Sequence, residues 1–148
     1  MSAVPISAVC SRLFAHRRKM ALWTLQGWTA MFFIAVGLSK LLQPETELPE
    51  VFAWTGAVPL AFTRTAGVVE IASGYLLLAQ AFPIPRSRLL IGIGAAAAAF
   101  LATAMLAVHL VRLEALPAAI NAVLLAASLT ILRLQSAKAE RQTSAFTS

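Results

Sequence analysis

The sequence predicts an all-α integral membrane protein, a four-helix bundle whose N and C termini both lie in the cytoplasm. Of its 148 residues, 59% are hydrophobic and only 12% are charged, about half the share of roughly 25% that is usual in soluble domains. The mean hydropathy is +0.80. The charges gather in short clusters between long apolar runs. This layout is typical of a chain that crosses a bilayer several times, and the length allows one domain.

The long apolar runs predict four membrane-spanning helices, at residues 21–42, 61–81, 88–111 and 117–134. They divide the chain into a basic tail, a membrane domain and a polar tail, at residues 1–19, 20–134 and 135–148. We expect the polar tail to be disordered. Pro117 fits the first turn of the last helix, where proline is tolerated. The aromatic segment 51–60 is expected to lie at the membrane interface.

The basic residues predict the orientation of these helices. Most of them lie in the two tails or between the second and third helices: Arg12, Arg17, Arg18, Lys19, Arg86, Arg88, Arg133, Lys138 and Arg141. Most of the acidic residues lie on the opposite side. Because positively charged loops stay in the cytoplasm, both termini are expected there, and the acidic loop 45–50 outside. An even number of spans satisfies this pattern, and the predicted location is the bacterial cytoplasmic (inner) membrane.

The composition excludes several classes of function. The net charge is +6, but the basic residues flank apolar segments, so membrane orientation explains them better than nucleic-acid binding. Cys10 is the single cysteine, so the chain has no CxxC motif for a thiol–disulfide relay. One histidine and one carboxylate within the predicted spans are too few for a structural metal site. A haem with two axial histidines would need a second histidine in a span.

Glu70 lies near the middle of the apolar run TRTAGVVEIASGYLLL. At helical spacing it shares one stripe with small or polar residues: Thr63, Ala66, Gly67, Ser73 and Gly74. Small residues let a neighbouring helix approach closely, so Glu70 should face helices rather than lipid, and the predicted packing positions are Gly37, Gly67 and Gly74. A charge at the bilayer centre costs about 2.5–3.5 kcal/mol, which a partner, water or a proton must offset.

The ionisable residues within the predicted spans all fall in the outer half of the membrane, and Asn121 begins the last helix at that level. Lys40 either extends to the interface or pairs with Glu70. Glu70 is either a tie between helices or a proton or ligand site. His109 is either an interfacial residue or a proton relay or quinone headgroup contact. Asn121 either joins helices or contacts a ligand, and Arg64 is expected to anchor at the interface.

Four segments carry a family resemblance: FFIAVGLSKL in the first helix, TAGVVEIASGYLLL in the second, MLAVHLVR closing the third and LPAAINAVLLA opening the fourth. In their order and spacing, over residues 21–133, the chain resembles DoxX-like membrane proteins, and the tails lie outside the resemblance. That family is named for a small subunit of a sulfur-oxidising, quinone-linked membrane complex. The resemblance therefore implies a fold and a redox-complex context rather than a reaction.

The first functional hypothesis is an accessory subunit of a quinone-linked membrane redox system, with no catalytic residue of its own assigned. Its outer-half cluster would bind a quinone or an oxidoreductase partner, membrane-bound or soluble. The second is a non-enzymatic assembly or scaffold protein, in which the cluster only specifies helix packing. A small proton-coupled transporter with Glu70 as carrier ranks last, because no inverted repeat is evident. No covalent cofactor or metal is expected, and the partners are the lipid bilayer and, left open, a second copy of the chain.

Overall fold

The protein is described here by a computed structural model, which covers the backbone of residues 6–84 and 86–146 and the side chains of residues 16–84 and 86–136. The regular elements are α1 (Ile6–Leu42), α2 (Leu48–Val51), the 3₁₀ turn η1 (Ala53–Ala57), α3 (Leu60–Leu77), the 3₁₀ turn η2 (Ala79–Ala81), α4 (Ser87–Val111) and α5 (Ala115–Phe146). Within these described residues every regular element is helical, so the all-α prediction is confirmed. The side chains of Cys10, Arg12, Lys138 and Arg141 lie outside the described part.

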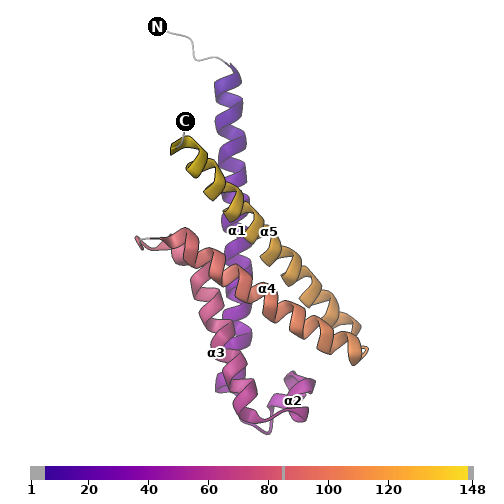
Figure 1. Cartoon of the computed structure of the whole chain (residues 1–148). Coiled ribbons are helices and arrows are strands. Elements are labelled where there is room, and N and C mark those ends of the chain that lie inside the picture. Colours follow the sequence, from indigo (N-terminus) through magenta and orange to yellow (C-terminus); the bar gives the residue numbers. More distant parts are fainter. Residues whose placement is uncertain (1–5, 85, 147–148) are drawn as a thin grey trace.

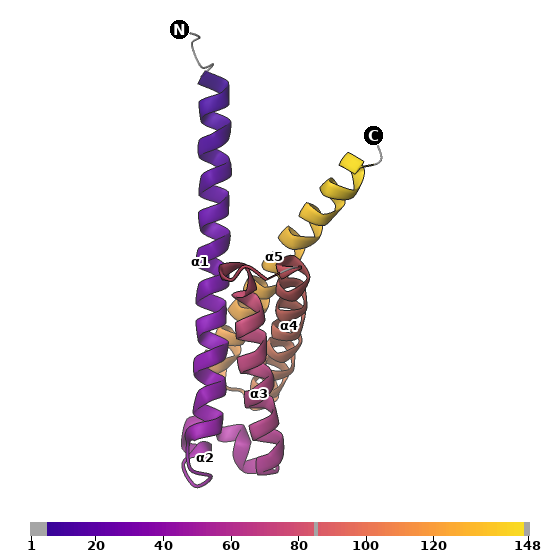
Figure 2. The same cartoon turned by 90° about the vertical axis from the view of Figure 1, so that its left-hand side faces the viewer.

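The long helices alternate in direction, so that successive connections lie at opposite ends of the molecule (Figures 1 and 2). α3 packs against α1 on one side and α4 on the other, and α4 packs along α5. The packed parts of these four helices form the helical body. The N-terminal part of α1 and the C-terminal part of α5 project beyond it at the same end, whereas α2 folds against the opposite end.

Three helices are long and apolar enough to cross a membrane, over His16–Leu42, Ser87–Val111 and Ala115–Ser136. These helices are those of an integral membrane protein. α3 is shorter, at 18 residues, and carries Arg64 and Glu70, and it is not among the three.

The helix boundaries differ from the predicted ones by two residues or more at four helix ends. α1 begins at Ile6 and so runs through most of the basic tail, and α5 continues to Phe146. The prediction of a disordered tail after residue 134 is therefore wrong for this stretch, whose SAKAERQ sequence holds good helix formers without glycine or proline. α5 also starts before Pro117, which still lies in the first turn, where the missing N–H has no helical partner. α3 ends at Leu77, earlier than predicted, and η2 follows.

Glycines allow α1 and α3 to touch backbone to backbone. A Cβ atom at Gly67 would lie 2.9 Å from the carbonyl oxygen of Gly37, and one at Gly37 would lie 2.6 Å from the carbonyl oxygen of Gly67. At Gly74 a Cβ would lie 2.8 Å from the carbonyl oxygen of Ala30. The structure buries most of the stripe expected around Glu70, including Thr63 and Ser73. Lipid tails are as apolar as helix surfaces, so the hydrophobic effect contributes little to the association of helices in a membrane. Close van der Waals contact of this kind supplies that energy instead.

Replacing Gly67 by alanine should therefore lower the thermal stability of the protein in detergent, by about 1–3 kcal/mol of unfolding free energy, because the new methyl group meets a backbone oxygen. Gly92 is the matched control, since a Cβ there meets nothing within 4 Å. Gly92→Ala should leave stability unchanged or raise it by up to about 1 kcal/mol, because alanine favours helix. Equal responses at the two positions would show that the crossing of α1 and α3 is not set by close backbone contact.

Candidate functional site

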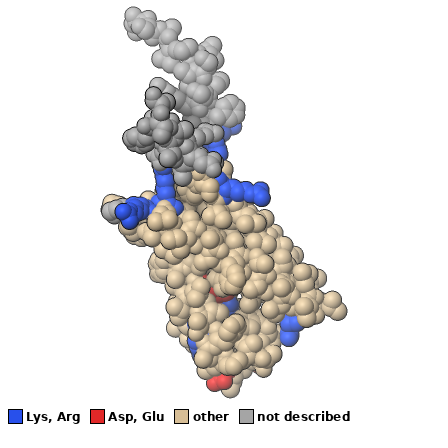
Figure 3. Space-filling view, in the orientation of Figure 1, with Lys and Arg blue, Asp and Glu red and all other residues tan. Residues whose placement is uncertain are grey.

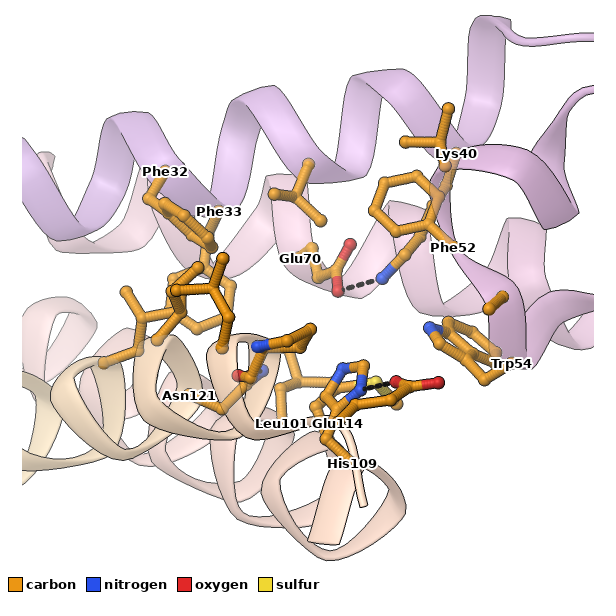
Figure 4. A pocket seen from close by; sticks show the side chains of 18 of the residues that line it. Phe32, Phe33, Lys40, Phe52, Trp54, Glu70, Leu101, His109, Glu114 and Asn121 are labelled. Atoms are coloured by element: carbon orange, nitrogen blue, oxygen red, sulfur yellow. Dashed lines mark hydrogen bonds and ion pairs between the residues drawn. The ribbon is translucent and has the colours of Figure 1, made fainter. Parts of the chain in front are cut away.

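A cavity of about 330 Å³ lies between the α1–α3 pair and the α4–α5 pair. Its walls are mainly apolar and aromatic, with polar groups from every long helix and from the α2–η1 segment: Phe32, Phe33, Val36, Lys40, Glu50, Val51, Phe52, Ala53, Trp54, Glu70, Leu101, Met105, His109, Glu114, Leu116, Pro117, Ile120, Asn121 and Leu124. Figure 3 shows red and blue atoms inside a hollow part-way along the helical body; the surface immediately around the hollow is tan, and further blue and red atoms lie toward both ends of this face. Figure 4 shows Lys40 and Glu70 on one wall and His109, Glu114 and Asn121 on the other.

Lys40 and Glu70 form a buried ion pair on the first of these walls. Nζ of Lys40 donates a hydrogen bond to Oε1 of Glu70 (Figure 4), and the two side chains are only 2% and 4% exposed. Lys40 is thus turned into the protein and does not extend to the membrane interface. Oε2 of Glu70 is buried and has no hydrogen-bond partner among the described residues.

Aromatic rings enclose the rest of the Lys40 ammonium group. Its Nζ lies 5.3 Å from the ring centroid of Phe52 and 5.2 Å from that of Trp54. Both distances fall within cation–π range, where the negative ring face attracts the cation. The segment at residues 51–60, which was expected at the interface, therefore folds inward at Trp54, whose side chain is buried. It covers one end of the cavity and stabilises the charge inside it.

Arg64 connects α3 to the end of α1. Its Nη1 donates to the carbonyl oxygen of Lys40, and its Nη2 donates to that of Gln43 over 2.8 Å. The last carbonyl groups of a helix have no partner within the helix, and a guanidinium can satisfy two of them at once. Arg64, near the N-terminal end of α3, thus caps α1. It fixes the last turn of α1, from which the Lys40 side chain extends into the cavity.

His109 and Glu114 form a second polar pair on the opposite wall. Nδ1 of His109 lies 2.6 Å from Oε2 of Glu114, and Nε of Arg112 donates to Oε1 of Glu114 over 2.6 Å. The hydrogen bond from Arg112, and to a smaller extent that from His109, holds the pKa of Glu114 below its ordinary value of 4.5. The ionised carboxylate requires the proton on Nδ1, so the Nε2 atom of a neutral His109 is an acceptor.

The turn after α4 brings Glu114 to this position. The N–H of Glu114 donates to the carbonyl of His109, and the N–H of Leu113 donates to that of Leu110. This is the Schellman arrangement, which satisfies the terminal carbonyls of a helix and requires a left-handed residue. Leu113 adopts that conformation with φ 58°, although glycine would do so without strain. The pairing of His109 with Glu114 depends on this turn.

Asn121 lies on the α5 side of the cavity and does not join helices through its amide nitrogen. Its Nδ2 donates to the carbonyl of Pro117 in the same helix, over 2.9 Å. The structure thus brings Lys40, Glu70, His109 and Asn121 to one cavity, whereas Arg64 is placed outside its lining.

Two cavity residues and one polar contact of functional interest were not among the candidates predicted from the sequence. Glu114 and Trp54 line the cavity, although they were assigned to a loop and to the interface. The spacing of Glu114 from His109, across one helix end, is the signal that could have indicated their pairing. At the other end of the body, Nε2 of Gln80 donates to Oε1 of the buried Gln26. A glutamine inside a predicted span could have indicated that second polar contact.

The cavity has the features of a small-molecule site rather than a metal site. Its volume is near the lower end of the roughly 300–1,000 Å³ usual for ligand pockets, and few polar groups stand among many apolar ones. Within the described residues, no group of three or more histidine, cysteine or acidic side chains could hold a metal ion. The arrangement can therefore surround an apolar ring and orient it by hydrogen bonds.

The Lys40–Glu70 pair predicts strong coupling between the two positions. Lys40→Met or Glu70→Gln alone should each reduce the free energy of unfolding by about 3–5 kcal/mol, because each leaves the other group unpaired in a low dielectric. The double variant should recover much of that loss. Thermal unfolding in detergent measures each corner of this double-mutant cycle. A second cycle, which combines Glu70→Gln with Arg133→Met on the exposed face of α5, is the control and should be additive. Additivity at positions 40 and 70 would contradict a direct pair.

The Glu114 contacts predict a stability difference that depends on pH. Since the folded pKa lies below the ordinary value of 4.5, the stabilisation is fully present above that pH. It is lost as the pH falls from there through the folded pKa. The melting temperature of the wild type should therefore exceed that of Glu114→Gln at about pH 6, and the difference should shrink toward about pH 3. A difference that is constant across this range would argue against the charged contacts.

The comparisons with known proteins agree with this architecture. The sequence model of the DoxX-like family matches residues 24–131. This range includes all of α3 and α4, the C-terminal half of α1 and the N-terminal half of α5. The match covers all of the cavity residues described above. No curated protein and no solved structure matches the chain. The matched region is well over half of the sequence, and the chain therefore belongs to the DoxX-like family.

Proposed function

We propose that the protein is a four-span membrane protein whose cavity binds a quinone, and that it serves as an accessory subunit of a quinone-linked redox system in the bacterial cytoplasmic membrane. The cavity carries this proposal. It combines aromatic walls, from Phe33, Phe52 and Trp54, with polar groups on two opposite sides. A quinone ring is flat and apolar with polar oxygens at opposite ends, so it matches both the walls and the placement of the polar groups.

The position of the cavity supports entry of a lipid-dissolved ligand. The hollow in Figure 3 lies on the side of the helical body, where the surrounding surface is tan, and the other blue and red atoms of this face lie toward its two ends. Such a face is suited to contact with acyl chains. A quinone dissolved in the bilayer could then reach the polar groups without crossing water. A water-soluble metabolite would have no comparable path through this face.

The fourth span is α3. Its Glu70 is neutralised by Lys40 and its Arg64 is bound to carbonyl groups of α1, so its two charges are satisfied within the protein. This reduces the cost of placing them at membrane depth. An up-and-down arrangement of four spans also agrees with the two termini at one end. The exposed Arg17 and Arg18, in the N-terminal part of α1, and Arg133, in the C-terminal part of α5, lie toward that end, as expected for a cytoplasmic side.

A subunit role without catalysis of its own suits the chemistry of the cavity. Its side chains offer hydrogen bonds and charges but no redox-active group, so electrons would have to come from a partner protein. The second candidate function, an assembly or scaffold protein, is favoured by a different observation. The contacts of Lys40 and Arg64 are all within the chain, and such contacts could serve packing alone.

The proposed topology predicts which positions an impermeant thiol reagent can reach in intact cells. A cysteine at position 47, in a Cys10→Ser background, should be labelled from outside. Cys10 of the wild type and a cysteine at position 136 should be labelled only after permeabilisation, because both termini are cytoplasmic. Labelling of positions 10 and 136 from opposite sides would show an odd number of spans and remove α3 from the membrane.

Quinone binding predicts quenching of the fluorescence of Trp54, which lines the cavity. A variant with Trp23→Phe and Trp28→Phe keeps Trp54 as its single tryptophan. Duroquinone, added to this variant in lipid nanodiscs, should quench it with saturation, because a bound ring lies against the indole.

The matched control keeps Trp28 alone, since this residue is 47% exposed on α1 and reports quinone dissolved in the lipid. It should show only a linear decrease. The same linear response at both tryptophans would contradict a quinone site and leave the scaffold function as the better account.

A further inference from the structure

The polar groups of the cavity are dominated by hydrogen-bond acceptors. The carboxylates of Glu50, Glu70 and Glu114 all line it. An ionised carboxylate can accept about four hydrogen bonds and donates none. Oε1 of Glu70 accepts one from Lys40, whereas Oε2 is buried without a partner in the described structure. A soft torsion joins this carboxylate to its side chain, so rotation about it can present either oxygen to the cavity. Glu70 thus retains acceptor capacity that the protein does not use.

Three donor side chains of the cavity are directed to groups of the protein. Nζ of Lys40 is directed to Glu70 and lies between two aromatic rings. Nδ1 of His109 is bound to Glu114, and Nδ2 of Asn121 donates to Pro117. A ligand that brings only acceptors would leave the free oxygen of Glu70 without a partner. A ligand that brings a donor would satisfy a group that is now buried and unpartnered.

The charges of the lining residues also favour a neutral ligand that donates a hydrogen bond. Glu70 neutralises Lys40, Arg112 neutralises Glu114, and Glu50 adds negative charge on the side near α2. An anion would find no unpaired positive charge among these groups. A neutral ring with a hydroxyl group needs no such charge, and its hydrogen bond to a carboxylate is of the stronger, charge-assisted kind.

We infer that the cavity selects the hydroquinone form of its ligand over the quinone form, with one ring hydroxyl donating to the carboxylate of Glu70; this rests on the quinone-binding function proposed above. The two forms share the same ring and shape. The quinone has two carbonyl oxygens that only accept, whereas each hydroxyl of the hydroquinone can donate. A site that offers a buried acceptor discriminates against an otherwise similar molecule without the donor, because the acceptor then stays unpaired.

The test compares three ligands that share one ring: duroquinone, its hydroquinone and the dimethyl ether of that hydroquinone. Each is dialysed anaerobically against nanodiscs that contain the wild-type protein and against empty nanodiscs, which correct for partition into lipid. The hydroquinone should bind about tenfold more tightly than the quinone, as expected for one charge-assisted hydrogen bond. The dimethyl ether, which keeps the ring and loses both donors, should bind no better than the quinone.

A variant then locates the acceptor. Lys40→Met combined with Glu70→Gln removes both charges together and so leaves neither group unpaired. In this double variant the preference for the hydroquinone should fall to less than about threefold. Val123→Ala is the control, because it changes an exposed apolar residue of α5 outside the cavity lining, and it should keep the full preference.

The outcomes separate this inference from the function on which it rests. Equal binding of the two redox forms, or tighter binding of the quinone, would overturn the inference while the quinone site stands. No binding of any ligand above that of empty nanodiscs would overturn both. A preference that survives in the folded double variant would show that another group accepts the hydroxyl and would overturn the role of Glu70. If the double variant does not fold, the three ligands on the wild type still decide the preference.

Discussion

The buried ion pair between Lys40 and Glu70 is the interaction on which the rest of the structure depends. An ionised carboxylate buried in α3 would be costly without a partner, and the lysine at the end of α1 supplies the opposite charge. The pair also requires that the two helices lie very close together. The facing glycines, Gly37 and Gly67, provide that distance. Packing and electrostatics are therefore not separate here, because the ion pair forms only where the glycines let the backbones touch.

The surroundings of the pair consist of groups that hold Lys40 in place. Arg64 caps the end of α1 and so fixes the turn that carries Lys40, while Phe52 and Trp54 enclose the ammonium group. These contacts come from α3 and from the connection between α1 and α3. They hold the α2–η1 segment against the end of the helical body. They also leave Glu70 as the group at this wall whose hydrogen-bonding capacity is incomplete.

The cavity has two walls of different character. The α1–α3 wall combines the glycine contact, the ion pair and the cap. The α4–α5 wall depends on the strained turn at Leu113, which directs Glu114 toward His109. Strain of this kind persists where the surrounding structure enforces it and is common at functional sites. The incomplete pairing of Glu70 and the strained turn lie on opposite sides of the same space.

The sequence by itself determined the membrane class, the helical content and the positions of the polar residues. Long apolar runs leave few alternatives to helix, and the small-residue stripe around Glu70 indicated which face of α3 meets a neighbour. Only the tertiary structure decided which polar groups meet. Lys40 and Glu70 are 30 residues apart, and the sequence permitted either a pair or two independent roles. The inward turn of Trp54 and the contact of Glu114 with His109 likewise depend on how loops fold back over helix ends. Helix periodicity fixes directions within one helix, but the depth and rotation of one helix against another follow from packing that no single segment encodes.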